Sequence, residues 1–382
     1  MRNPRPDQGF SLDRRQLLLT GSAVVAGLAL RAGRARGAEG ALFVSCRIDA
    51  ANGHHLTGID QTGHVRFDLP LPERGHGAAC RPGADEGVVF ARRPGTFTVA
   101  FDPVAGVALR RIDAARGRHF YGHGAFSPDG RYLFTSENDY ETGRGVLGVR
   151  DATDNYGQIG ELASHGVGPH ELVLMPGGAT LAVANGGILT HPERDRAKLD
   201  LDSMAPSLAY LDLADGKLRA DYRLAAEHHQ LSIRHLAVLG SGGIAIAMQY
   251  EGDMRDRVPL VGIHDGDRIR LLEAPAGVQA QMRQYCGSVA VDRGGNLIAV
   301  SAPRGNLVTF WDAADRSFLC STMLADGCGV APTDQPGAFL ITSGIGQVMR
   351  FEPRTGLRTM IAVTELQDTG WDNHLRMHPA TA

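Results

Sequence analysis

Short apolar segments separated by turns follow one another along most of the chain, and their order repeats. In residues 121–130, a histidine precedes a short apolar run that ends in the turn Pro128-Asp129-Gly130. Copies of this phrase occur at 75–83, 169–178, 234–243 and 286–295, with weaker copies at 328–332 and 374–379. The leading residues of the copies are 47, 47, 65, 51, 42 and 46 positions apart. A period in the forties that is built of short strands is typical of a β-propeller, with one blade for each repeat.

Each repeat contains the apolar segments of four strands. After the first strand and its turn comes a second strand, such as residues 131–136, and then a third that ends near an acidic residue such as Asp102 or Asp312. A fourth strand, for example residues 317–324, completes the repeat. Apolar and polar residues alternate within these segments, which favours strands over helices. Seven leading residues therefore predict an all-β, seven-bladed propeller.

The two ends of the chain complete each other. Residues 41–48 resemble a second strand with no first strand before it, and the segment at His374 resembles a first strand with no others after it. We expect both to share one blade, so that pairing of the N- and C-terminal strands closes the ring without an unpaired edge. The longest repeat has surplus residues at 186–206, which we interpret as a charged excursion between its second and third strands.

The leading residues are candidates for a metal site. They are five histidines and two cysteines: His76, His123, His170, His235, Cys286, Cys328 and His374. Because the first strand of each propeller blade lines the central channel, we expect these side chains to form a ring at one mouth of it. Imidazole nitrogen and thiolate suit iron, copper and zinc, whereas calcium would require oxygen ligands. The alternative is a hydrated channel in which the histidines bind water and carbonyl groups, and the cysteines are packed or disulfide-bonded.

The loops at the same mouth supply a candidate ligand or partner face. Strand alternation brings there Arg74, Arg118, Arg234, Arg283, Arg304, Glu137, Gln249 and Tyr250, together with Asn138 and Asp139. Basic and polar residues around a concave mouth indicate a place for an anionic ligand or a protein partner. Ordinary solvated loops are the alternative for any one of these residues.

The N-terminus has the features of an export signal rather than of the fold. Arg14 and Arg15 precede the apolar run 17–30, and small residues near Ala38 offer a cleavage site. The paired arginines resemble a twin-arginine signal, so we expect residues 1–37 to be removed and residues 38–382 to form a periplasmic propeller. The apolar run is shorter than the ~20 residues that span a bilayer, so no membrane span is expected after cleavage.

Composition narrows the function classes further. The first 37 residues hold seven arginines and two aspartates, a net +5, which leaves −8 for the rest of a chain whose total is −3. An acidic body with only 6% aromatic residues argues against nucleic acid as a partner. The chain has no nucleophile elbow, no dinucleotide fingerprint between a strand and a helix, no P-loop and no Cys-x-x-Cys-His haem motif. Five cysteines are an odd number, so at least one is not paired within the chain.

Two families resemble this chain. The twin-arginine signal, the Gly-His-Gly-Ala-Phe-Ser-Pro-Asp-Gly phrase at 122–130 and the Gly-Pro-His-Glu-Leu phrase at 168–172 resemble exported bacterial propellers classed as domain-of-unknown-function family 1513. Members tend to be encoded beside imelysin-like and di-haem peroxidase-like proteins, which implies periplasmic iron acquisition. The histidines are also similar to those of the nitrous oxide reductase propeller, where a histidine ring holds a copper–sulfide cluster. In this chain cysteines take two of the ring positions and the separate copper domain is absent.

These observations give one main hypothesis and two alternatives. The main hypothesis is a periplasmic propeller that binds a transition metal, iron or copper, through the His/Cys ring and that serves other periplasmic metal-handling proteins. The first alternative is a non-catalytic scaffold that docks partner proteins and has a structural ring. The second is a metal-dependent redox enzyme. Residue spacing names neither the metal nor a substrate.

Overall fold

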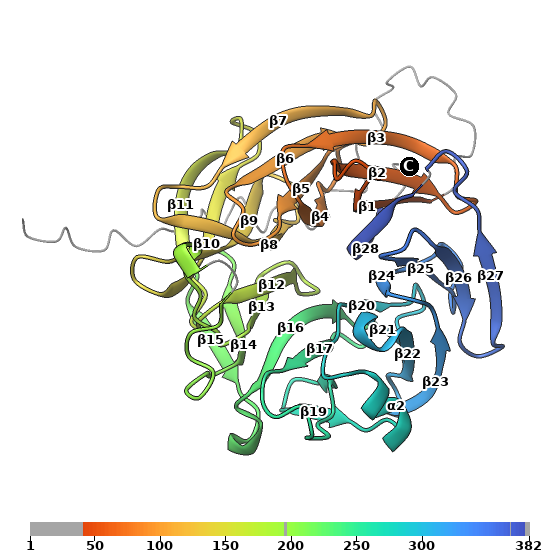
Figure 1. Ribbon diagram of the computed structural model, residues 1–382. Coiled ribbons are helices and arrows are strands. Elements are labelled where there is room, and N and C mark those ends of the chain that lie inside the picture. The colour runs from red at the N-terminus through yellow and green to blue at the C-terminus, as the bar shows by residue number, and fades with distance from the viewer. Residues whose placement is uncertain (1–40, 195–196, 367, 379–382) are drawn as a thin grey trace, which may run out of the picture.

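Seven four-stranded antiparallel sheets surround a central channel (Figure 1). The computed structural model describes residues 41–194, 197–366 and 368–378. The predicted signal at residues 1–37 lies outside the described residues. The all-β class and the seven blades are as the repeat pattern predicts. Among the described residues, helix is confined to the short α2 (Ala276–Gln281) and the 3-10 turns η1 (Pro192–Arg194), η2 (Ala226–His228) and η3 (Pro303–Gly305).

Within each blade the strands follow the chain from the channel outward. Three blades consist of β4 (Gly75–Cys80), β5 (Gly87–Ala91), β6 (Phe97–Asp102) and β7 (Val107–Asp113); β8 (Arg118–Phe126), β9 (Tyr132–Asp139), β10 (Arg144–Asp151) and β11 (Gly157–Ala163); and β12 (Pro169–Leu174), β13 (Thr180–Asn185), β14 (Ser207–Asp212) and β15 (Leu218–Tyr222). Three more consist of β16 (Leu231–Val238), β17 (Ile244–Tyr250), β18 (Val261–His264) and β19 (Ile269–Leu272); β20 (Ser288–Val291), β21 (Leu297–Ala302), β22 (Leu307–Asp312) and β23 (Ser317–Met323); and β24 (Gly327–Pro332), β25 (Phe339–Ser343), β26 (Val348–Glu352) and β27 (Leu357–Ile361).

The seventh blade joins the two ends of the described chain. Its innermost strand is β28 (Gly370–His378), followed by β1 (Leu42–Ile48), β2 (His54–Asp60) and β3 (Val65–Leu71). β28 runs antiparallel to β1, with Leu42 opposite His378 and Ile48 opposite Gly370. This pairing confirms the predicted closure, which leaves no blade without its inner strand.

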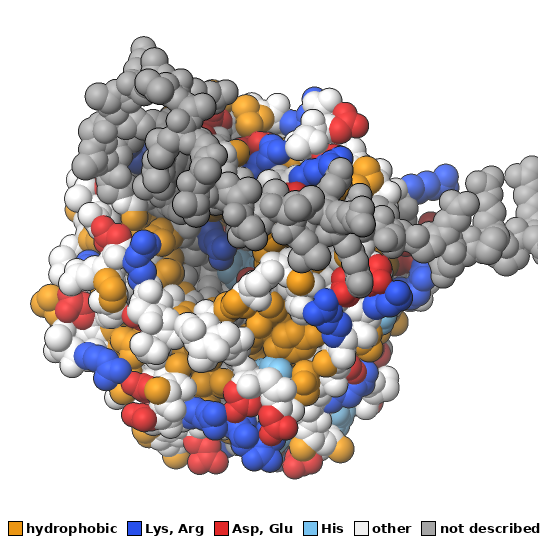
Figure 2. Space-filling model, turned by 180° about the vertical axis from the view of Figure 1, so that it is seen from behind, with side chains coloured by type: hydrophobic (Ala, Val, Ile, Leu, Met, Phe, Trp, Pro, Cys, Tyr) orange, Lys and Arg blue, Asp and Glu red, His pale blue; other side chains and the backbone are white. Residues whose placement is uncertain are grey.

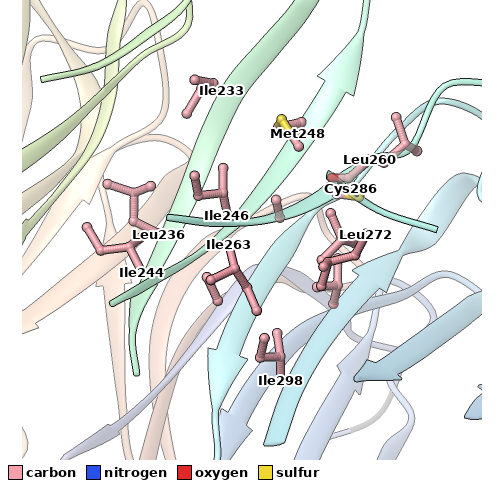
Figure 3. Packing of buried hydrophobic residues seen from close by; sticks show 14 of the residues in the cluster. Ile233, Leu236, Ile244, Ile246, Met248, Leu260, Ile263, Leu272, Cys286 and Ile298 are labelled. Carbon is pink, nitrogen blue, oxygen red and sulfur yellow. Dashed lines mark hydrogen bonds between the residues drawn. The ribbon is translucent and has the colours of Figure 1, made fainter. Parts of the chain in front are cut away.

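Apolar side chains between neighbouring blades form the core. Second and third strands are buried on both faces, as in β5, where all five residues are buried, because a blade is sandwiched between two others. Fourth strands lie at the rim, and β7 exposes six of its seven residues and buries only Ile112. In the largest cluster, Ile233, Met248 and Leu260 pack between β16, β17 and the neighbouring blade (Figure 3). Dispersion and burial at these blade interfaces hold the innermost strands at fixed positions around the channel.

The surplus segment 186–206 lies between β13 and β14, as predicted, and is anchored on the preceding blade. The Tyr121 hydroxyl lies 3.2 Å from Thr190 Oγ1, and Asn138 Nδ2 donates to the Thr190 carbonyl at 3.0 Å. These buried hydrogen bonds fix the segment beside the channel. No helix in the described part of the chain is long and apolar enough to cross a membrane.

Candidate metal centre

Six of the seven innermost strands change register at or beside the residue that leads the repeat, and β20 is the exception. In β8 the pairing with β9 shifts between Phe120 and Gly124, an interval that contains His123. Comparable shifts occur at His76 in β4, His170 in β12, His235 in β16, Cys328 in β24 and His374 in β28. A β-bulge releases a side chain from strict alternation and redirects it. The recurring phrase therefore encodes an irregular strand as well as a leading residue.

The histidines lie inside the channel rather than at its mouth. We expected each leading residue to open its strand. His76 and His170 do lie at the start of β4 and β12, each as the second residue. By contrast, β8 begins five residues before His123, and β28 begins four residues before His374. Two cavities meet at the histidines. One is lined by His76, His170 and His235, and the other by His123 and His374. The bulges make this possible because they turn side chains inward in the middle of a strand.

The five imidazoles of these residues form one cluster. Their ring centroids lie between 4.4 Å (His76 and His374) and 6.1 Å (His76 and His170) apart for the contacting pairs. His76, His123 and His235 are buried. Residues from five different blades therefore converge, because each blade contributes its innermost strand to the same short stretch of channel.

Glycines in the phrase leave room for the rings. A Cβ at Gly122 would lie 2.6 Å from His76 Cδ2, and one at Gly77 would lie 3.0 Å from His123 Nδ1. Gly122 also has φ of +101°, a conformation that side chains with a Cβ rarely adopt. The glycines of the Gly-His-Gly pattern are therefore needed because a larger side chain would crowd the histidine rings.

The ring nitrogens form two groups that could hold a metal ion. The ligand atoms of His76, His123 and His170 lie within 4.8 Å of one another, and those of His123, His235 and His374 form a second such group. His76 Nε2 and His374 Nε2 are 3.2 Å apart. Two nitrogens that share one ion at the usual ~2.1 Å bond length lie about 3 Å apart.

Two buried nitrogens of the cluster have no partner of their own. His123 Nε2 and His170 Nδ1 are buried, and neither has a hydrogen-bond partner among the residues that the structure describes. Unpaired buried polar atoms are costly, and a bound ion or water molecule would satisfy them. The donor set is uncharged nitrogen, which suits iron, copper, zinc and nickel better than calcium or magnesium. The residues present therefore fit a transition metal ion.

An aspartate fixes the orientation of His76. Asp372 Oδ1 lies 3.1 Å from His76 Nδ1, and Asp372 Oδ2 accepts a hydrogen bond of 2.5 Å from Arg74 Nε. Arg92 Nη1 lies 3.3 Å from the same carboxylate. Burial opposes ionisation of Asp372, but the His76 hydrogen bond and the charges of Arg92 and Arg74 outweigh it and hold its pKa well below the usual range. An ionised Asp372 keeps the proton on Nδ1 and leaves Nε2 of His76 as the free ligand atom.

Glu171 orients histidine rings on the other side of the cluster, as Asp372 orients His76. Glu171 Oε2 lies 3.1 Å from His235 Nδ1 and accepts the Leu236 backbone N–H at 3.2 Å. Glu171 Oε1 lies 3.7 Å from His123 Nδ1. Burial raises the pKa of Glu171, and the neighbouring His123 imidazole and the hydrogen bond from the Leu236 N–H oppose that rise. Carboxylates behind histidine ligands fix the ring tautomer and increase ligand basicity.

The histidines are neutral at neutral pH. Burial lowers the pKa of His76 to about 4, although Asp372 opposes the shift. Burial lowers the pKa of His123 and of His235 to about 3, and it also lowers the pKa of His170 and His374 well below the usual value. Only the neutral imidazole has a lone pair for a metal ion. No proton therefore competes for these nitrogens at pH 7.

The two cysteines that lead repeats lie outside the histidine cluster. Cys286 is fully buried among apolar side chains, with its Sγ 3.8 Å from the Leu260 carbonyl oxygen (Figure 3). Cys328 Sγ lies 3.2 Å from the Asp372 carbonyl oxygen and 3.5 Å from that of Trp371. Burial raises the pKa of Cys286 to about 12 and that of Cys328 further, the latter with help from the negative charges of Asp372 and Asp326. Both are thiols, and all five cysteines are free.

One cavity on the channel axis has a basic wall. It has a volume of about 680 Å³, and Arg74, Arg234, Arg304 and Gln249 of the predicted ligand face line it. The cavity on the other side of the histidines, about 500 Å³, has mainly small and apolar walls with Glu171 and Arg376. On the face shown in Figure 2, the centre of the ring is hollowed, and histidine and basic side chains lie at its floor.

The remaining residues of the predicted face lie elsewhere. Arg118 pairs with Asp139 at 2.8 Å and with Glu161 at 3.1 Å. Glu137 is buried beside Arg150, whose Nη2 is 3.1 Å away, while Asn138 anchors the surplus segment. The Tyr250 hydroxyl donates to Asp256 at 2.8 Å, and Arg283 lines a separate small cavity with Met254.

Sequence reasoning missed several residues of the centre. Asp372 stands two residues before His374, the same offset as Arg74 before His76, and Glu171 follows His170 directly. A comparison of the residues at the same distance from each leading residue would have identified Asp372 and Glu171 as candidates. Arg92, Arg93, Lys198, Tyr121, Tyr285 and Asn373 also line the basic cavity. Lys198 belongs to the surplus segment, where no repeat pattern exists to place it.

Solved structures of similar fold include two propellers with low sequence identity. A hydrazine synthase structure from Kuenenia stuttgartiensis matches with a TM-score of 0.60 and 13% identity over 88% of this chain and 99% of that chain. A functionally unknown protein from Desulfotomaculum acetoxidans DSM 771 matches with a TM-score of 0.58 and 12% identity over 88% and 98%. At such identities the similarity shows the fold alone. Among curated proteins no sequence matches.

The family itself is shown by sequence. A family model described as "Protein of unknown function (DUF1513)" matches residues 69–378, which contain every innermost strand and all five histidines of the cluster. The resemblance expected from the repeated phrases is thereby confirmed, and the chain belongs to the DUF1513 family.

Proposed function

We propose that this protein binds a transition metal ion, iron or copper, through His76, His123, His170, His235 and His374. The observation that carries the proposal is the pair of overlapping three-histidine groups that share His123. Each group offers the three nitrogens that commonly hold a metal ion in proteins. The two buried nitrogens without partners, on His123 and His170, are the positions that a metal ion would satisfy.

The surroundings of the cluster support a bound ion. Asp372 and Glu171 stand behind the rings and add negative charge without occupying the ligand positions. Five neutral nitrogens with two carboxylates behind them can hold a divalent or monovalent cation at neutral pH. Cys286 and Cys328 take no part in this proposal, because buried thiols with raised pKa values are poor metal ligands.

We further propose that the protein works in the periplasm as an accessory in metal acquisition or handling. The paired arginines and apolar run within residues 1–37 support twin-arginine export. That route carries folded proteins, so a metal ion buried in the channel can be loaded before translocation. Other periplasmic metal-handling proteins are the partners this role implies.

Metal analysis of the purified protein tests the proposal. The wild type should contain, or take up on titration, iron or copper in stoichiometric amount. His123→Ala should lose that metal, because His123 belongs to both ligand groups. His264→Ala is the matched control, since His264 is also buried but lies in β18 beside Tyr210, away from the channel. Circular dichroism would verify that both variants are folded.

A wild-type protein that takes up neither iron nor copper would contradict the proposal and favour the docking scaffold. Equal metal loss in His264→Ala would show that the loss follows damage to the fold. Retention of metal in a folded His123→Ala would place the ion elsewhere. Redox activity that depends on the bound metal would favour the alternative function, a metal-dependent redox enzyme.

A further inference from the structure

The basic cavity beside the histidines contains more positive than negative side chains. Seven cationic residues line it: Arg47, Arg74, Arg92, Arg93, Lys198, Arg234 and Arg304. Among the described residues, its lining includes two carboxylates, Asp326 and Asp372. Positive charge in a concave site with low-dielectric walls focuses the field and attracts anions. We call this cavity the basic chamber.

The carboxylates near the chamber are shared between cations. Asp372 is bound by both Arg74 and Arg92. Glu251 is bound by Lys198 and lies 3.5 Å from Arg234 Nη2. Arg47 is paired with Asp68 at 2.7 Å. Each shared carboxylate neutralises one of its two cations, so the chamber keeps an excess of positive charge.

Arg234 has an unfulfilled donor at the chamber. The residue is 8% exposed, and its Nε is buried without a hydrogen-bond partner. A buried guanidinium N–H without an acceptor is costly, and a small anion in the chamber would supply the acceptor. The planar guanidinium group matches carboxylate and phosphate oxygens particularly well.

Arg304 supplies a second cation, from the blade next to that of Arg234. Its guanidinium carbon lies 4.2 Å from the centre of the Tyr285 ring, which holds the group flat. Within the described part of the chain, Arg304 has no carboxylate partner. Asn373 Nδ2 donates to the Tyr285 hydroxyl at 3.2 Å, which fixes the aromatic platform itself. Arg304 is therefore preorganised but not neutralised.

Size and overall charge restrict the kind of anion. A volume of about 680 Å³ falls within the ~300–1,000 Å³ range of small-molecule sites. The chain beyond residue 37 has a net charge of −8, which repels extended polyanions such as nucleic acid. A small anion that enters the chamber entirely experiences the local excess of positive charge instead.

We propose that the basic chamber binds a small oxyanion with at least two negative charges, of the polycarboxylate or phosphate class, against Arg234 and Arg304. Its role rests on the proposed function: an anion held here lies beside His76, His170 and His235 and can supply oxygen ligands to the metal ion. The binding itself depends on the arginines and does not require the metal.

Calorimetry on the metal-free full-length mature protein tests the proposal, with citrate, inorganic phosphate and chloride as probes at low ionic strength. We expect citrate, phosphate or both to bind with micromolar to sub-millimolar affinity, and chloride not to compete at the same concentration. Arg304→Gln and Arg234→Gln should each weaken binding at least tenfold. Arg255→Gln, which alters an exposed arginine paired with Asp253, should leave binding unchanged. Arg304 is exposed, so its variant keeps the test decisive even if Arg234→Gln does not fold.

The two proposals fail in different ways. His123 lines the other cavity, so His123→Ala should lose the metal and keep anion binding. If only citrate or only phosphate binds, and the binding depends on Arg304, the result supports anion binding in the basic chamber. It also identifies the anion class as polycarboxylate or phosphate. The proposal is overturned if neither anion binds to metal-free or metal-loaded wild type, or if binding is unchanged in Arg304→Gln.

Discussion

The channel has a histidine side and a cysteine side, and the same repeated phrase builds both. Five blades place an imidazole in the channel, whereas the blades that begin with β20 and β24 place Cys286 and Cys328 against backbone carbonyls. β24 has a register shift around its leading residue, as the histidine strands do. Strand irregularity alone therefore does not decide where the side chain goes.

The size and polarity of the side chain account for the difference. A thiol is small and weakly polar, so it packs into the apolar cluster between blades, as Cys286 does beside Leu260 and Met248 (Figure 3). An imidazole is larger and needs polar partners, and Asp372 and Glu171 supply them at the channel. Equivalent positions in a repeat thus acquire different roles through their neighbours.

The strongest test of the histidine side alters the carboxylates behind the rings. Asp372→Asn and Glu171→Gln keep the shape of each side chain but remove the charge that orients His76 and His235. We expect metal affinity to fall about 10- to 100-fold in each, measured by competition with a chelator. Asp312→Asn is the control, because Asp312 is a buried carboxylate paired with Arg354 far from the channel. Unchanged metal affinity in both channel variants would show that these carboxylates do not contribute to metal binding.

A second test crowds the histidine side without changing a polar group. Gly122→Ala places a methyl group 2.6 Å from His76 Cδ2, while Gly177→Ala has the same positive-φ strain in open space. The strain costs on the order of 1–2 kcal/mol in either variant. Only Gly122→Ala should also weaken metal binding, by about tenfold if the ~1.4 kcal/mol of a displaced ring applies. Equal affinities in the two variants would show that ring spacing is not critical.

Much of this organisation could be predicted from sequence, for identifiable reasons. The phrase around His123 recurs with conserved spacing of turn and strand, so it revealed the seven blades, the closure by β28 and β1, and the convergence of five histidines. The direction of the Cys286 and Cys328 side chains depends on packing between blades, which a single repeat does not contain. The position of Lys198 depends on how residues 186–206 fold beside the channel. Asp372 acts on a histidine 296 residues away, a contact that only ring closure creates.

A third test separates the channel from a buried histidine outside it. Burial lowers the pKa of His119 to about 4, and its Nε2 lies 3.0 Å from Asn138 Nδ2. Between about pH 6.5 and pH 4 the unfolded chain binds this proton and the folded chain does not, so stability falls as the pH falls. At pH 5 the loss relative to pH 7 should be on the order of 2 kcal/mol. His119→Gln should lack this part of the pH dependence in denaturant unfolding, whereas His229→Gln, at an exposed position, should retain it.

The smallest effect is expected on the cysteine side. Cys286→Ala and Cys328→Ala should leave metal affinity within about twofold of wild type, since neither Sγ belongs to a ligand group among the described residues. Both should lower the free energy of unfolding by about 1 kcal/mol, because each removes a buried sulfur from a packed site. A large loss of metal in either folded variant would indicate that the cysteine contributes to the metal site.

X-ray absorption of the metal-loaded wild type tests the central claim most directly. We predict a first shell of nitrogen or oxygen at about 2.0–2.1 Å with the multiple-scattering pattern of imidazole, and no sulfur near 2.3 Å. That result would place the ion on the histidine side of the channel. A first shell that contains sulfur, or one without imidazole, would contradict the account.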